Sequence, residues 1–364
     1  MMRGVLVAAI ATLAVVLVSC DRSASIDFSD SALETSVREA LGISRGPLRR
    51  SDLLRLTELQ AIGRGIGRLE GLEACSNLLR LDVGENYVSD LTPLAELHQL
   101  ETLILRSNRV TDVSALSELT GLRKLDLDFN FVTDVTPLVG LAELQWLGLW
   151  NSGISDVGPL AGLTKLTELG LGGNPIEDFR PLAGLVKLVW LGLPNTGIEN
   201  LAPLAGLTDL VKLSLGGNSI EDLAPLCSLT CLEGLGLDSN RIVDLSPLAG
   251  LVELRRLSLW GNRIEDVSAL AGLVQLEELW LDRNPVSDVS VLSGLPHLRI
   301  VGLSETAVTD LAPLVENPGL GEGDRLNLRG AAIDVEDGSI ARERIHRLLD
   351  RGVLVEFGPI GIDP

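Results

Sequence analysis

This sequence has few of the residues that build metal centres, disulfide scaffolds and nucleic-acid surfaces. Its four cysteines lack the close spacing of metal ligands and are too few for a disulfide-rich fold, so they predict neither. Basic residues are outnumbered by acidic ones, 30 to 50, which gives a net charge of −20. This charge excludes a nucleic-acid partner, because the phosphate backbone would repel it. It also argues against a purely electrostatic attachment to anionic lipids.

Aromatic residues are scarce as well. They make up 3% of the 364 residues, whereas hydrophobic residues make up 46%. The core is therefore expected to consist mainly of aliphatic side chains. Length alone does not predict the number of domains in a repetitive chain, so internal repeats determine how this chain is organised.

From Leu78 onwards the chain repeats a pattern of 22 residues, L-x-x-L-x-L-x-x-N-x-I-x-D-L-x-P-L-x-x-L. Leucines at alternate positions predict a short strand that points them inward, and stacked copies predict a parallel sheet. The asparagine lies where the chain turns inward, so its side chain is expected to satisfy backbone groups that would otherwise be buried without partners. Its position recurs without insertion at Asn86, Asn108, Asn130, Ser152, Asn174, Thr196, Asn218, Asn240, Asn262, Asn284 and Thr306.

An aspartate follows the asparagine position in every copy except one, which has Asn200. It precedes a segment of one helical turn, and we expect it to act as the N-cap of that turn. A column of calcium sites is the alternative. Single carboxylates about 5 Å apart, each committed to backbone amides, make a poor cage for an ion that takes six to eight oxygens. We therefore expect no metal site.

The repeat resembles the leucine-rich repeat, and its D-L-x-P-L ending is similar to that of internalin-like bacterial surface proteins. The resemblance runs from about Phe28 to Phe357. It implies an α/β fold, a curved solenoid with a parallel β-sheet on the concave face and short 3-10 or irregular segments on the convex face. Internalin-like proteins include adhesins that bind host receptors, so the resemblance also implies a binding function.

The two ends of a solenoid need covers, because a bare end exposes its leucines. Residues 31–41 predict a helix that Gly42 ends, and this segment resembles the N-terminal cap of internalin-like proteins. Residues 340–349 predict an amphipathic helix that is closed by Gly352 and followed by a last strand at Val353 and Val355. Three extra residues between 317 and 325 precede a degenerate last repeat.

The first twenty residues predict export. Arg3 and the apolar run from Val5 to Val18 are typical of a signal peptide, and the run is too short to span a bilayer comfortably. The sequence Leu-Val-Ser-Cys that ends at Cys20 resembles the lipobox of bacterial lipoproteins, which implies lipidation of Cys20 and an anchor in the bacterial cell envelope, at the inner or the outer membrane. An ordinary secretory signal is the alternative. The expected division is 1–19 signal peptide, 20–27 lipidated tether, 28–55 N-terminal helical cap, 56–334 solenoid and 335–364 C-terminal cap and tail.

We expect neither an enzyme nor a cofactor. The histidines His98, His297 and His346 lie in different repeats, and the first two are more than about 40 Å apart at about 5 Å per turn. The glycine-rich stretch from Gly170 to Asn174 opens no helix, which excludes a phosphate-binding loop.

The tryptophans indicate a binding surface. The residues six, four and two positions before each asparagine position face the concave side, and all five tryptophans fall there. Large indoles on a solvent face favour a partner, although packing of the rings on one another is the alternative. Glycines such as Gly148 between them predict a trough with a nearly bare floor. The candidate ligand-binding residues are Trp146, Trp150, Trp190, Trp260, Trp280, Asp126, Asp128, Arg256 and Asp282.

The sequence therefore predicts a membrane-anchored extracytoplasmic binding scaffold, a monomer, whose concave face binds a protein or peptide. A cell-wall glycan or polysaccharide is the alternative partner, because indoles stack on sugar rings. A purely structural envelope component is the third hypothesis. Among the cysteines, Cys75 replaces a leucine and is expected to be a buried thiol. For Cys227 and Cys231, four residues apart on the convex side, a local disulfide in an oxidising compartment stays open.

Overall fold

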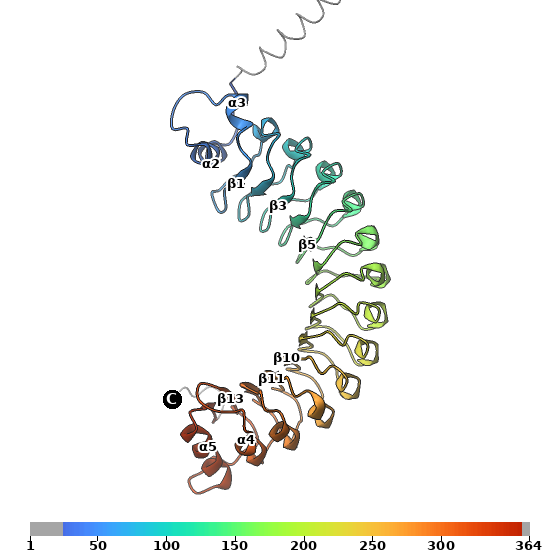
Figure 1. Cartoon of the computed structure of the whole chain (residues 1–364), viewed down its shortest axis with the longest axis vertical. Coiled ribbons are helices and arrows are strands. Elements are labelled where there is room, and N and C mark those ends of the chain that lie inside the picture. Colours follow the sequence, from blue (N-terminus) through green and yellow to red (C-terminus); the bar gives the residue numbers. More distant parts are fainter. Residues whose placement is uncertain (1–24, 359–364) are drawn as a thin grey trace, which may run out of the picture. The chain divides into compact units, whose positions relative to one another are not determined.

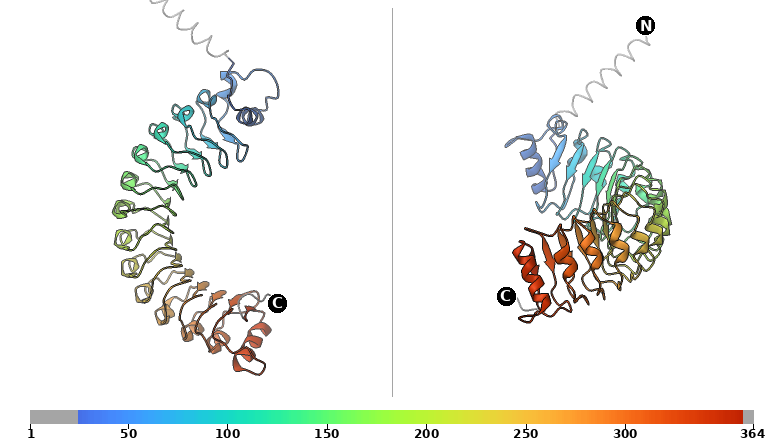
Figure 2. Two further views of the ribbon diagram at one scale, coloured as in Figure 1. Left: turned by 180° about the vertical axis from the view of Figure 1, so that it is seen from behind. Right: turned by 60° about the horizontal axis from the view of Figure 1, so that its bottom comes forward.

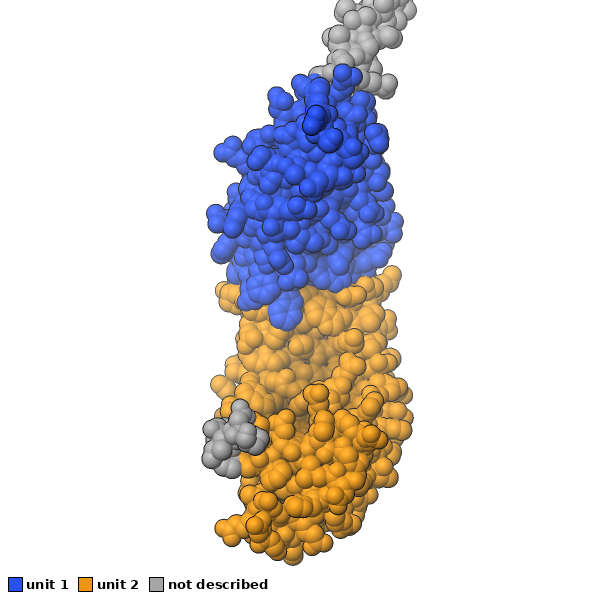
Figure 3. Space-filling model, turned by 90° about the vertical axis from the view of Figure 1, so that its left-hand side faces the viewer, with its two compact units in different colours: residues 1–166 blue, residues 167–364 orange. Residues whose placement is uncertain are grey.

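The computed structural model describes residues 25–358. It divides into two compact units, residues 1–166 (unit 1) and residues 167–364 (unit 2), each of which is described by itself (Figure 3). The expected signal peptide and the lipidation of Cys20 lie outside the described residues. Within the described range, no helix is both long enough and apolar enough to cross a bilayer.

Unit 1 starts with helices α2 (Ser31–Leu41) and α3 (Arg50–Leu53) and continues as stacked repeats of one strand and one 3-10 turn (Figure 1). Neighbouring strands are parallel and follow the 22-residue period, so that Leu81 lies opposite Leu59 and Leu103. The strands are β1 (Glu58–Gln60), β2 (Arg80–Asp82), β3 (Thr102–Ile104), β4 (Lys124–Asp126) and β5 (Trp146–Gly148). The turns are η1 (Leu72–Ala74), η2 (Thr92–Leu94), η3 (Ser114–Leu116), η4 (Thr136–Leu138) and η5 (Gly158–Gly162).

Unit 2 repeats the same parallel arrangement and carries two helices near its end, α4 (Ala312–Glu316) before β13 and α5 (Ile340–Asp350) before β14. Its strands are β6 (Glu168–Gly170), β7 (Trp190–Gly192), β8 (Lys212–Ser214), β9 (Gly234–Gly236), β10 (Arg256–Ser258), β11 (Glu278–Trp280), β12 (Ile300–Gly302), β13 (Arg325–Asn327) and β14 (Leu354–Glu356). Its turns are η6 (Arg180–Gly184), η7 (Ala202–Leu204), η8 (Ala224–Leu226), η9 (Ser246–Leu248), η10 (Ser268–Gly272) and η11 (Ser290–Gly294). Ile300 pairs with Arg325, so the predicted three extra residues are confirmed at this step.

Within each unit the strands lie on the inner side of the coil and the 3-10 turns on the outer side (Figures 1 and 2). The leucines of the repeat fill the space between them and are buried. The predicted solenoid, with a parallel sheet on the concave face and 3-10 turns on the convex face, is confirmed within each unit.

The asparagine ladder has the predicted role. Asn130 is 2% exposed, and its Nδ2 donates to the carbonyl of Leu105 at 2.9 Å and to that of Leu127 at 3.0 Å. Its Oδ1 accepts the Val110 N–H at 3.0 Å. One side chain thus connects its own repeat to the previous one. Where threonine replaces asparagine, a hydroxyl has a single proton to donate, and that of Thr306 goes to the carbonyl of Leu303 at 2.7 Å.

The aspartate ladder differs from the expectation by one residue. Asp112 was expected at the N-cap of η3, but Val113 is the N-cap residue and has no side-chain capping bond. Asp112 instead accepts the Ser114 N–H at 2.8 Å, two residues on, which is an Asx turn that leads into the 3-10 turn. This backbone hydrogen bond holds the pKa of Asp112 below its usual range. Within residues 25–358, no group of three or more acidic, histidine or cysteine side chains is placed to hold a metal ion.

The predicted end helices are confirmed. Asp30 caps α2 by accepting the Ala32 and Leu33 N–H groups on Oδ1, and its Oδ2 accepts the Gly67 N–H at 2.8 Å. Gly42 ends α2 with a left-handed φ of 70°. At the other end α5 covers the expected residues, and β14 is the predicted last strand.

The three described cysteines are free thiols. Cys75 is buried, as predicted, and burial raises its pKa to about 12. The structure holds Cys227 and Cys231 as exposed thiols, without the local disulfide that the sequence left open.

Candidate functional site

All five tryptophans lie where the repeat predicts them. We call the outward-pointing residues six, four and two positions before each asparagine position the strand face of a unit. Trp146 and Trp150 lie on the strand face of unit 1, and Trp190, Trp260 and Trp280 on that of unit 2. Trp260 is 36% exposed and the other four are half-buried. The indoles are therefore neither packed among the core leucines nor fully open to solvent.

In unit 1 the face carries a group of charged and aromatic side chains, from β4 and β5 and from the residues just after β3, β4 and β5, that we call the Trp146 cluster. The Lys124 ammonium lies 4.4 Å from the centre of the Trp146 ring, within the range of a cation–π contact. Asp128 Oδ1 accepts the backbone N–H of Trp150 at 2.8 Å, and Asp126 Oδ1 accepts the backbone N–H of Asp128 at 3.1 Å. The cluster consists of Arg106, Lys124, Asp126, Asp128, Trp146 and Trp150.

The floor of the Trp146 cluster is not bare. A Cβ placed on Gly148 would lie 2.7 Å from Cη2 of Trp146 and 2.7 Å from Oδ1 of Asp128. The indole of Trp146 and the carboxylate of Asp128 therefore both fold over this glycine. In this strand the small middle residue makes room for the protein's own side chains, in contrast to the trough predicted from the sequence.

The two carboxyl groups of the cluster are poorly solvated. Burial, with a smaller contribution from the charge of Asp126, raises the pKa of Asp128 to about 6, although the backbone N–H of Trp150 and the charge of Arg106 act against this shift. Burial also raises the pKa of Asp126, although the Asp128 N–H and the charges of Arg106 and Lys124 act against it. At neutral pH the cluster thus holds negative charge in a partly desolvated place, which favours an approaching cation.

Ionisation of Asp128 is expected to destabilise the fold. Its folded pKa of about 6 exceeds the ordinary value of 3.8, so the wild-type chain should lose stability relative to Asp128→Asn as the pH rises from about 4 to about 7. Asparagine keeps the oxygen that accepts from Trp150. Midpoints of urea unfolding across this pH range measure the difference.

Asp112→Asn on the convex face is the control, because its effect on stability should change with pH in the opposite direction. The pKa of Asp112 is lowered, so its carboxylate contributes stability above the ordinary pKa and loses this contribution as the pH falls. The Asp112 variant should therefore be the less stable protein at neutral pH, with a gap that closes on acidification. Parallel pH profiles for the two variants would contradict these assignments.

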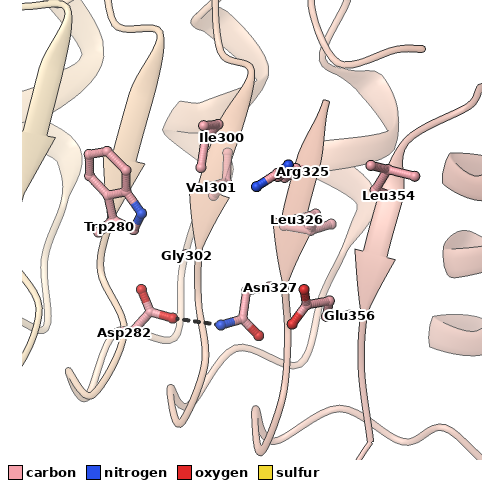
Figure 4. A pocket seen from close by; sticks show the side chains of 10 residues that line it. All are labelled: Trp280, Asp282, Ile300, Val301, Gly302, Arg325, Leu326, Asn327, Leu354 and Glu356. Atoms are coloured by element: carbon pink, nitrogen blue, oxygen red, sulfur yellow. Dashed lines mark hydrogen bonds between the residues drawn. The ribbon is translucent and has the colours of Figure 1, made fainter. Parts of the chain in front are cut away.

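Unit 2 has a hollow of about 500 Å³ on its strand face, here called the Trp280 hollow (Figure 4). Ile300, Arg325 and Leu354 are in register and form one row. Trp280, Gly302, Asn327 and Glu356 form the next row, and Asp282 lies beyond Trp280 and beside Asn327. Asp282 is held by the Ser304 N–H at 2.9 Å and by Asn327 Nδ2 at 3.3 Å. Burial raises its pKa. The Asp282 carboxylate also covers Gly302, where a Cβ would overlap it.

The remaining predicted residues lie apart from these two groups. Arg256 Nε is 3.4 Å from Glu278 Oε1 on the adjacent strand, so its charge is already paired. The Arg283 guanidinium lies 5.1 Å from the centre of the Trp260 ring. Trp190 in β7 has Lys212 beside it in register on β8. The structure thus brings together Asp126, Asp128, Trp146 and Trp150 in unit 1, and Trp280 and Asp282 in unit 2.

Of the residues that line the Trp280 hollow, the sequence predicted only Trp280 and Asp282 as binding residues. Arg325, Asn327 and Glu356 come from β13 and β14, which follow the three-residue insertion and no longer fit the 22-residue frame. The signal was present in the R-L-N-L-R sequence from 325 to 329, which repeats the alternation of a strand.

Comparison with known proteins places the chain among repeat proteins. Residues 98–140, 142–184, 232–272 and 252–294 match the family model described as Leucine Rich repeats (2 copies). A search of curated proteins found no match.

Three solved structures illustrate the similarity. An internalin (inlF) from Listeria monocytogenes is 32% identical, with a TM-score of 0.72 over 80% of this chain and 94% of that chain. A leucine-rich-repeat protein of Leptospira interrogans is 24% identical, with a TM-score of 0.71 over 79% and 74%. The leucine-rich-repeat ectodomain of a plant membrane receptor kinase from Arabidopsis thaliana, in complex with Casparian strip integrity factor 2, is 19% identical, with a TM-score of 0.62 over 79% and 40%. The last two show the fold alone.

Proposed function

This chain belongs to the internalin-like leucine-rich-repeat family, and on that premise we propose that it is a membrane-anchored binding scaffold whose strand face takes a protein or peptide partner outside the cytoplasm. Leucine-rich-repeat proteins of this kind generally mediate protein–protein interactions. The plant receptor ectodomain of the same fold was solved in complex with a named factor, which agrees with a binding role for such surfaces. Catalysis forms no part of the proposal.

The observation that carries the proposal is the Trp146 cluster. Two half-buried indoles lie beside two partly desolvated carboxyl groups on a sheet that the repeat makes rigid. Aromatic anchors surrounded by polar and charged side chains are typical of protein interfaces. The carboxyl groups favour a basic side chain of the partner, which would compete with Lys124 for the face of Trp146.

The anchor is the second part of the proposal. A lipid on Cys20 would hold the exported chain at the cell envelope. The tether would be shorter than the expected residues 20–27, because the Ile26 N–H donates to the carbonyl of Leu48 at 2.8 Å and so joins the N-terminal cap. Buried acyl chains contribute about 0.8 kcal/mol per CH₂, so two or more chains anchor a protein stably. Metabolic labelling with a fatty-acid analogue tests this part, because Cys20→Ala should abolish the label.

A saccharide is the second candidate ligand, and the Trp280 hollow favours it. An indole face lies there beside planar polar side chains that hydrogen bonds already fix. Titration with neutral oligosaccharides would detect such a site, because saturable quenching should disappear in Trp280→Phe.

The main proposal is tested by cross-linking the full chain in envelope extract. The triple variant Trp146→Ala, Trp150→Ala, Trp280→Ala should lose the partner that the wild-type chain captures. The matched control removes exposed apolar side chains at other positions, in Val139→Ala, Val186→Ala, Val252→Ala, and should keep it. Equal capture by both variants would refute the strand-face assignment, and absence of any captured partner for the wild-type chain would leave a purely structural envelope role.

A further inference from the structure

Unit 1 carries a second aromatic surface that lies beside its strand face. Tyr87, Phe129 and Phe131 are 55%, 47% and 62% exposed, which is unusual for such large apolar side chains. They lie with Arg109 in the bends that follow β2, β3 and β4. We call Tyr87, Arg109, Phe129 and Phe131 the rim patch. It contains the only tyrosine of the chain and two of its five phenylalanines.

The rim patch has a regular spacing. Tyr87, Arg109 and Phe131 each follow the asparagine position in three successive repeats. The repeats stay hydrogen-bonded at this edge, because Arg109 N–H donates to the carbonyl of Val88 at 2.8 Å and Phe131 N–H to that of Val110 at 2.9 Å. The spacing of parallel strands, about 4.8 Å, therefore applies here too, and the backbones that carry Tyr87 and Phe131 lie about 10 Å apart.

Arg109 lies in the repeat between those of Tyr87 and Phe131. Its guanidinium is 4.7 Å from the centre of the Tyr87 ring. Within residues 25–358 it forms no ion pair, although the chain as a whole carries excess acid. The patch thus presents two aromatic rows with one positive charge between them.

Phe129 occupies a backbone conformation that phenylalanine rarely adopts. Its φ is 56°, in the left-handed region, which the equivalent residue adopts in every repeat from Glu85 to Glu305. Its N–H donates to the carbonyl of Trp150 at 2.7 Å. The repeat thus sets this backbone conformation, and what distinguishes Phe129 is an exposed aromatic ring in a slot that other repeats fill with glycine or a polar side chain.

We propose that the rim patch binds a proline-rich segment of a partner protein, in polyproline II conformation, with an acidic residue beside the prolines. Polyproline II has three residues per turn and a rise of about 3.1 Å, so side chains on one face recur about every 9.3 Å. This repeat matches the separation of the Tyr87 and Phe131 rows. Proline-rich segments dock on aromatic surfaces at low entropic cost, and Arg109 supplies the partner for the carboxylate.

The test uses the full chain and fluorescent dodecapeptides with two Pro-x-x-Pro motifs. One peptide carries flanking glutamates, the second has lysines in their place, and the third has alanines in place of the prolines. The glutamate peptide should bind saturably and the alanine peptide should not. Tyr87→Ala and Phe131→Ala should each weaken binding about tenfold or more, and Arg109→Glu should transfer the preference to the lysine peptide. Val139→Ala, an exposed change at another position, should leave binding unchanged.

Phe129→Gly separates loss of binding from loss of folding. Glycine adopts a positive φ without strain, so this variant should unfold at an unchanged or higher temperature while its peptide affinity falls. Absence of saturable binding, equal binding of the alanine peptide, or insensitivity to the rim variants would each overturn the proposal. So would self-association of the chain that Phe131→Ala abolishes, because the patch would then bind a second copy.

The rim patch does not depend on the strand-face function. Trp260→Ala, Trp280→Ala should retain the proline-rich peptide even if it loses an envelope partner. A chain that binds the peptide but captures no partner would contradict only the proposed function, and the converse result would contradict only the rim patch.

Discussion

Asn130→Ala is expected to lower the free energy of unfolding by about 4 kcal/mol, more than a typical change at a solvent-exposed position. The variant leaves the Val110 N–H without its partner and the Leu127 carbonyl with only the distant hydroxyl of Ser152, at 3.5 Å. The Leu105 carbonyl loses one of two donors and keeps Asn108 Nδ2 at 2.9 Å. Each unsatisfied buried group costs about 1–3 kcal/mol, and some relaxation reduces the sum. Because the asparagine joins two repeats, the loss affects both of them.

Urea unfolding of Asn130→Ala beside Thr306→Ala measures this effect. The Thr306 hydroxyl donates a single bond, to the carbonyl of Leu303, so its loss should cost about 1 kcal/mol. The difference between the two variants isolates the bonds that only the amide forms. Equal costs would mean that water replaces the asparagine and that the ladder contributes shape more than hydrogen bonding.

The regular parts of the fold follow from the period of the sequence. A strict 22-residue repeat determines which side of the strand each residue occupies, so the buried leucines and the strand-face positions of the tryptophans were predictable. The end of helix α2 was predictable because Gly42 is a strong helix stop signal, whereas its cap Asp30 was not singled out. In each of these cases a local feature of the sequence, the position in the repeat or a helix stop signal, determines where the residue lies.

The details of the candidate sites depend on contacts that a period does not encode. Nothing in the repeat indicates that Trp146 folds over Gly148, because the rotamer depends on the space left by neighbouring side chains. The Trp280 hollow was missed in part because an insertion moves β13 out of frame. The rim patch was missed because its residues occupy bends, where the pattern predicts turn formers and gives no reason to look for a surface.

Aspartates on the two faces of the repeat show how context overrides residue type. Asp112 on the convex side accepts a backbone N–H in solvent, which lowers its pKa. Asp128 on the strand face also accepts a backbone N–H, yet burial raises its pKa to about 6. The same side chain therefore stabilises a turn on one face and prepares a partly desolvated charge on the other. Much of the net negative charge comes from aspartates that stabilise turns, whereas only the few partly buried carboxylates are available to bind a partner.

Gly148→Ala is expected to weaken partner binding at the Trp146 cluster about tenfold, which corresponds to about 1.4 kcal/mol, without removing any side chain of the cluster. The new methyl group would meet the far end of the Trp146 indole and the Asp128 carboxylate, each at 2.7 Å, so both must move. Their displacement also weakens the hydrogen bond from the Trp150 N–H to Asp128. Alanine is at least as favourable as glycine in a strand, so the fold should persist.

Fluorescence of a chain that keeps Trp146 and has phenylalanine at the other four tryptophan positions measures the displacement before any partner is known. The alanine variant should expose the indole and increase its quenching by acrylamide. Gly236→Ala is the matched control, because a methyl group at the equivalent position of β9 meets its nearest neighbour, Ser214 Oγ, at an ordinary 3.7 Å. If Gly148→Ala and Gly236→Ala left the quenching equally unchanged, Gly148 would not position the indole, and the geometry proposed for recognition in unit 1 would be wrong.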